Sequence, residues 1–186
     1  MKNVHSRVFQ ASIDAVRPWI EAAWSGTDRD VFPRDVIPTW RKNPAGVDPG
    51  ALVPGQTLVG HGPLRFRLRE WNGARWRVDI IGGASGWHGF DLEEQDGRCR
   101  VTHTLVVELS GTKRITMPLT VEPIHDWAVE SLFDRLEEAL RTGRVPERTA
   151  RPMPLRAAVP FQLMRAARRR SAGRGPKPIE SAPPAG

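Results

Sequence analysis

The sequence has no tyrosine, one cysteine and no long apolar run. The lone thiol, Cys99, cannot form an internal disulfide, which is typical of a protein kept in a reducing compartment. A membrane-spanning helix needs about 20 consecutive apolar residues, and no segment approaches that length. Residues 1–12 also lack the apolar stretch of a secretory signal peptide. We therefore expect a soluble protein of the cytoplasm.

Acidic residues are scarce in one part of the chain, residues 144–186. This tail contains 10 Lys and Arg against 2 Asp and Glu, whereas residues 1–143 contain 18 against 19. The net charge of +7 for all 186 residues therefore comes from the tail. Because the body is close to neutral, any attraction to nucleic acid or anionic lipid should be a property of the tail.

The chain also lacks the short motifs of common catalytic and metal sites. It contains no Gly-x-Ser-x-Gly nucleophile motif and no glycine-rich phosphate loop ahead of a helix. His5, His61 and His125 have no metal-ligand spacing with one another or with Cys99. We therefore assign no metal ligand and no cofactor.

Alternation of apolar and polar residues predicts strands at the N-terminus and through the middle of the chain. These runs cover residues 3–11, 57–62, 64–69, 75–80, 87–94 and 99–109. The Asn72-Gly73 pair between two of them is a strong hairpin signal. A further short strand near residues 36–41 would bring the number to seven. Each strand has one polar and one apolar face, so the sheet must cover its apolar face with another layer.

Two helices are predicted beside these strands. The first follows Ser12, a suitable N-cap, and carries apolar residues at helical spacing as far as Trp24, with Pro18 inside it. The second is long and amphipathic, runs from Ile124 to Leu140, and can be capped by Gly143. We interpret its acidic residues as a solvated face and its apolar stripe as the cover of the sheet.

The order of these elements resembles that of START-like, Bet v 1-like and polyketide cyclase/dehydrase-like domains, the SRPBCC superfamily. The matching segments are "VFQASIDAVRPWI" at 8–20, "LVPGQTLVGHG" at 52–62, "GRCRVTHTLVVEL" at 97–109 and "WAVESLFDRLEEAL" at 127–140. The resemblance implies an α+β helix-grip fold, a curved antiparallel sheet of about six to seven strands wrapped on a long C-terminal helix. It would form one domain over residues 1–143, followed by the basic tail, residues 144–186.

The resemblance further implies a cavity between the concave face of the sheet and the long helix. Inward-facing apolar residues point to the same place, and a cavity is favoured over the alternative, in which they fill a solid core. The candidate ligand-binding residues are Leu64, Phe66, Leu68, Trp76, Val78, His88, Phe90, His103, Leu105 and Trp127.

Two of these residues, His88 and His103, place imidazoles among apolar side chains. Such a group can orient a ligand or act as a base, and His103 is the weak catalytic candidate. The plainer alternative, a buried histidine paired with a neighbouring strand or water, is favoured for His103. The residues leave open whether any reaction is catalysed, and a non-catalytic ligand-binding protein ranks first.

Three functions therefore stay open. The first is binding of a hydrophobic small molecule or lipid, the second is a polyketide cyclase/dehydrase-type enzyme, and the third is an interaction domain with a filled core. Several polar groups converging on His103 would favour catalysis. The sequence names neither the ligand nor the oligomeric state.

The tail has its own set of alternatives. Residues 155–170 can form a short amphipathic helix, and residues 171–186 are typical of a disordered segment. The tail could keep the protein in solution, pack back on the domain, or lie on an anionic membrane surface. Nucleic acid ranks last as a partner, because the tail lacks interleaved aromatic residues.

Overall fold

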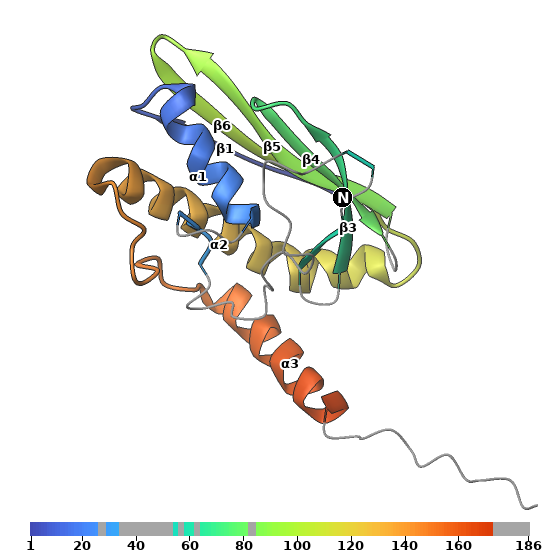
Figure 1. Cartoon of the computed structure of the whole chain (residues 1–186). Helices are drawn as coiled ribbons and strands as arrows, with labels where there is room; N and C mark the ends of the chain where they lie inside the picture. Colours follow the sequence, from blue (N-terminus) through green and yellow to red (C-terminus); the bar gives the residue numbers. More distant parts are fainter. Residues whose placement is uncertain (26–28, 34–53, 56–57, 62–63, 82–84, 173–186) are drawn as a thin grey trace, which may run out of the picture.

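The computed structural model describes residues 1–25, 29–33, 54–55, 58–61, 64–81 and 85–172. Over these residues the fold is α+β, with one antiparallel sheet and a long helix (Figure 1). The elements follow in the order β1 (Lys2–Phe9), α1 (Ile13–Ser25), β2 (Leu58–His61), β3 (Leu64–Trp71), β4 (Arg75–Ile81), β5 (Ser85–Gln95), β6 (Arg98–Glu108), α2 (Lys113–Thr142) and α3 (Leu155–Ala172).

The strands form an open sheet in the order β1-β6-β5-β4-β3-β2. The predicted hairpin joins β3 to β4 at Asn72 and Gly73, where Gly73 adopts φ 79° and the Asn72 side chain accepts the backbone N–H of Arg75. The strand expected at residues 36–41 lies outside the described residues. The described part of the chain thus has fewer strands than the seven at the upper end of the prediction.

The sheet buries one face under α1 and α2, which lie on the same side of it in Figure 1. The predicted N-cap is present at Ser12, whose side-chain oxygen accepts the backbone N–H of Ala15. On the other face, Arg69 of β3 and Arg75 of β4 form ion pairs with Asp79 and Asp91. Ion pairs of this kind are typical of the solvent-exposed face of a sheet.

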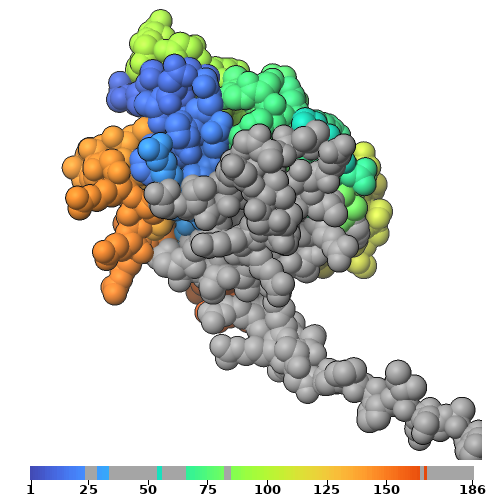
Figure 2. Space-filling model, viewed as in Figure 1, coloured from blue at the N-terminus to red at the C-terminus, as the bar shows by residue number. Residues whose placement is uncertain are grey.

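Helix α2 is longer than the sequence predicted, because it begins at Lys113 rather than near Ile124. Two features of the sequence obscure the start of this helix. Pro118 and Pro123 lie inside the helix, and the first turns leave Ile115 69% exposed, so their apolar residues mark no buried stripe. The start of α2, in yellow, lies at the surface in Figure 2. At the other end, Gly143 caps the helix as predicted, with φ 71° and its N–H donated to the carbonyl of Ala139.

A polar interface joins α2 to the edge strand β1. Its members alternate along β1 and recur every fourth residue along α2, and several of them are hydrogen-bonded or ion-paired across the interface. They are Asn3, His5 and Arg7 of β1 and Glu122, Asp126, Glu130 and Asp134 of α2. Four helical residues rise about 6.0 Å and two strand residues about 6.7 Å, so successive partners stay opposite one another.

Short hydrogen bonds cross this polar interface. Arg7 donates to Glu130 at 2.7 Å and to Asp134 at 2.7 Å, and Asn3 donates to Asp126 at 2.7 Å. The sequence-based interpretation of these acidic residues as a solvated face is therefore wrong for Asp126, Glu130 and Asp134, which face a strand more than a hundred residues away in the chain.

The segment after α2 packs back against that helix. Arg151 donates two hydrogen bonds to Asp134, at 2.7 and 3.0 Å, and its backbone carbonyl accepts the indole N–H of Trp127 at 3.3 Å. Ala157 and Phe161 of α3 are buried. Helix α3 thus packs against α2 as an additional part of the fold. Among the described helices, none has the length and apolar character that a membrane span requires.

Removing the Asp134 carboxylate should destabilise the fold in a pH-dependent way. Burial alone would raise the pKa of Asp134, but hydrogen bonds and charges from Arg151 and Arg7 outweigh it, so the pKa lies below its usual range. A depressed pKa stabilises the fold above the unfolded value of about 3.9, and this contribution is lost as the pH falls through the folded pKa. Asp134→Asn should cost about 1–2 kcal/mol at pH 7 and progressively less below about pH 4.

Urea unfolding of both proteins between pH 3 and pH 7 measures this difference. Glu137→Gln, a change at a carboxylate that is 71% exposed, is the matched control and should have little effect throughout. A deficit for Asp134→Asn that stays constant down to pH 3 would contradict the role of the ion pairs.

The packing of α3 predicts opposite outcomes for two neighbouring apolar residues. Phe161 is 8% exposed and Leu163 is 66% exposed. Phe161→Ala should lower the free energy of unfolding by about 3 kcal/mol, because it empties a buried site. Leu163→Ala should change it by less than about 0.5 kcal/mol. Equal effects in thermal or urea unfolding would show that α3 does not rest on α2 in solution.

Candidate functional site

The residues predicted to face the cavity are buried on the α2 side of the sheet. Side chains of β3, β4, β5 and β6 contribute to this wall, and Leu64 alone has a side chain outside the described part. The buried members are Phe66, Leu68, Trp76, Val78, His88, Phe90, His103, Leu105 and Trp127. Trp127 is turned toward the tail, since its indole N–H donates to Arg151.

Aromatic rings surround the two predicted histidines. Phe66 lies edge-on to His88 with ring centroids 4.7 Å apart, and Phe90 lies edge-on to His103 at the same 4.7 Å. Trp76 contacts His88 with centroids 5.9 Å apart. The strand register produces this grouping, because Phe90 pairs directly with His103.

The imidazoles continue into a row of four, which we call the histidine row. His88 Nδ1 lies 3.5 Å from His103 Nε2. The ring centroids of His103 and His125 are 5.0 Å apart, and those of His125 and His5 are 6.1 Å apart. The row thus runs from β5 across β6, touches α2 and ends on β1, where His5 stands opposite His103 in the strand register.

Burial keeps two members of this row, His88 and His125, uncharged. Burial, with a smaller contribution from His125, lowers the pKa of His88 to about 3. Burial, with a smaller contribution from His5, lowers the pKa of His125 to about 4, although Asp126 opposes the shift. At neutral pH both rings are therefore neutral, and each offers one N–H donor and one acceptor nitrogen.

The outer end of the row is ionic instead. His5 Nδ1 lies 2.8 Å from Glu130 Oε1, and His5 Nε2 lies 3.1 Å from Asp126 Oδ1. Arg7 in turn forms an ion pair with Glu130. The site therefore passes from charged groups at β1 to neutral imidazoles and aromatic rings at β5.

Sequence reasoning missed His5 and His125 as members of this site. Alternation along residues 3–11 does place His5 on the same side as Phe9, which is buried. Helical spacing also places His125 on the same face as Ala128 and Val129. Neither pattern shows that these two histidines meet, since the contact joins elements 120 residues apart.

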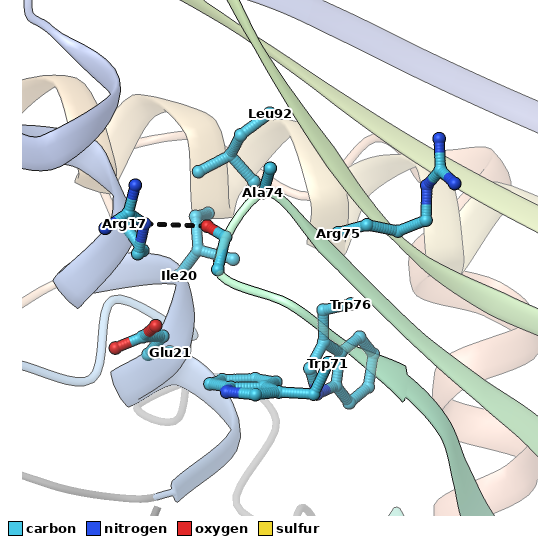
Figure 3. A pocket seen from close by; sticks show the side chains of 9 residues that line it. Arg17, Ile20, Glu21, Trp71, Ala74, Arg75, Trp76 and Leu92 are labelled. Carbon is cyan, nitrogen blue, oxygen red and sulfur yellow. Dashed lines mark hydrogen bonds between the residues drawn. The ribbon is translucent and has the colours of Figure 1, made fainter. Parts of the chain in front are cut away.

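In the described part of the chain, hollows lie away from the histidine row at two places. A small one of about 10 Å³ sits between α1 and the β3–β4 hairpin, beside Trp71 and Trp76 (Figure 3). Arg17 donates there to the carbonyl of Gly73 at 2.7 Å, and burial raises the pKa of Glu21 against the opposing charge of Arg17. This hollow is about the size of one water molecule.

The larger hollow is an open groove of about 650 Å³ at the end of β1 and β6. The start of α2 forms its other side. Its lining residues are Met1, Lys2, Val106, Val107, Glu108, Leu109, Arg114 and Pro118. Val107 is buried on the inner face of β6, so the groove reaches the edge of the wall that carries the histidines.

Comparisons with known proteins identify the fold. No family model and no curated protein matches the sequence. A protein from Thermobifida fusca solved by NMR is similar over 79% of this chain and 98% of its own, with a TM-score of 0.52 and 16% identity. A point mutant of norcoclaurine synthase from Thalictrum flavum, in complex with a transition-state analogue, is similar over 77% and 95%, with a TM-score of 0.51 and 14% identity. The chain therefore has the helix-grip fold of START-like and Bet v 1-like proteins.

Proposed function

We propose that this protein binds an apolar small molecule or lipid between the sheet and α2, and that His88 and His103 contact its polar group. The observation that carries the proposal is a pair of imidazoles 3.5 Å apart inside a wall of Phe66, Trp76 and Phe90. Concave, mainly apolar surfaces with a few converging polar groups are the usual sites for small molecules.

The charge state of His88 bears on the ligand's polar group. Because His88 is neutral at neutral pH, it offers no positive charge to an anion. A neutral imidazole pairs well with a hydroxyl or a carbonyl, through its one N–H donor or its one acceptor nitrogen. The proposed ligand therefore has an apolar body and an uncharged oxygen, and the open groove beside Val107 is its proposed entrance.

A cyclase or dehydrase activity is the second candidate, and the histidine row favours it. His103 is flanked by His88 and by His125, so several groups that can accept a proton converge there. An imidazole at His103 could remove a proton from a carbon next to a carbonyl and return it to the leaving hydroxyl as water departs. The norcoclaurine synthase mutant shows a transition-state analogue bound to a protein of this fold.

Native and denaturing mass spectrometry of the purified protein tests the binding proposal. The native mass should exceed the chain mass by that of a small organic molecule, which solvent extraction then releases for identification. A folded protein that carries no such molecule and takes up no apolar fluorescent probe would overturn the proposal.

Replacing His103 separates binding from catalysis. His103→Phe keeps the ring and its contact with Phe90 but removes both nitrogens. It should lower the affinity for the extracted ligand about tenfold, because one hydrogen bond is lost. It should change the affinity for a purely apolar probe by less than about threefold.

Thr102→Val is the matched control for this change, since Thr102 lies on the opposite face of β6 and bonds to Ser6. It should leave both affinities unchanged. If His103→Phe abolishes a turnover of the ligand while circular dichroism and binding are preserved, the enzyme is the correct alternative.

A further inference from the structure

We propose a binding site for a divalent transition-metal ion, of the zinc class, at the β1–α2 polar interface, formed by His5, His125 and Asp126. One ligand atom from each of these residues lies within 4.8 Å of the others. Two imidazoles and one carboxylate are a donor set that suits zinc and its neighbours in the first transition row. The site adjoins the His88–His103 pair of the proposed ligand site, because the rings of His125 and His103 lie 5.0 Å apart.

The bonding of His5 supports this site. Its two nitrogens face two carboxylates, Glu130 at 2.8 Å and Asp126 at 3.1 Å. A cation placed between His5 Nε2 and Asp126 Oδ1 would be coordinated by both atoms. The 3.1 Å spacing is close to the edge of about 3.3 Å in a tetrahedron of 2.0–2.1 Å zinc bonds.

Glu130 supplies the support that a metal-bound histidine requires. A ligating imidazole usually donates its other N–H to a carboxylate, which fixes the ring and its tautomer. Glu130 is the carboxylate that contacts His5 Nδ1, and it forms an ion pair with Arg7 at 2.7 Å. Metal coordination at His5 Nε2 therefore needs no rearrangement of the Glu130 contact.

The charges along the polar interface are uneven. Arg7 and Arg151 both pair with Glu130 and Asp134, at one end of the row of carboxylates. In the described part of the chain, the ion pairs of Asp126 are limited to His5. Among the described residues, the Asp126 end thus lacks the arginine pairs of the Asp134 end, and a bound cation would supply positive charge there.

Two further polar atoms, on His125 and Asn3, have no hydrogen-bond partner among the described residues. They are His125 Nδ1 and Asn3 Oδ1, both shielded from solvent. The Asn3 amide already contacts Asp126 through its nitrogen, so a rotation of the amide would present Oδ1 as a fourth ligand. An unsatisfied buried acceptor is costly, and metal binding would remove that cost.

Isothermal titration of the full chain with zinc chloride tests the site, with magnesium chloride as the control ion. We expect one zinc ion per chain with a micromolar dissociation constant and no uptake of magnesium. His125→Phe and Asp126→Asn should each weaken zinc binding at least tenfold. Glu138→Gln, on the same helix and paired with Arg141, should change it less than twofold.

Thermal unfolding with and without zinc adds a readout that a structural role alone would not move. Zinc should raise the melting temperature of the unaltered protein and of Glu138→Gln, but not that of His125→Phe. If His125→Phe fails to fold, Asp126→Asn decides the question. No zinc binding, or binding that both variants retain, would overturn the proposal.

Discussion

The pairing of α2 with the edge strand β1 is the constraint on which the site depends. Charged and polar residues repeat every second position on β1 and every fourth on α2, and the two repeats have nearly equal lengths. This match sets both the height and the rotation of the helix over the sheet. Asp126 then faces β1, and His125, turned by about 100° on the helix, faces His103 of β6.

The same pairing creates a gradient of polarity along one line of side chains. Arg7 and Glu130 form ion pairs at the β1 end, whereas Phe66 and Phe90 enclose the imidazoles at the β5 end. The charged end suits a cation, and the neutral end suits an uncharged polar group on an apolar molecule. One row of imidazoles can thus serve two kinds of binding, because burial differs along its length.

Sequence patterns were sufficient to predict the strands, because alternation with a period of two can be recognised from neighbouring residues alone. They also predicted the cap at Gly143. They failed at the start of α2, where Pro118 and exposed Ile115 mask the helical pattern. They also assigned Asp126 to solvent, since only the tertiary pairing with β1 distinguishes a carboxylate that contacts a strand from a solvated one. His88 and His103 could be placed on the inner face by parity, but their link to His125 required the fold.

Helix α2 lies on the sheet and buries His88, His103 and His125 against it. Nitrogen NMR of the imidazole rings, followed through a pH titration, tests this claim residue by residue. Because both rings are buried, His88 should stay neutral down to about pH 3 and His125 down to about pH 4. Titration of both rings near pH 6.5, the ordinary value for histidine, would contradict it.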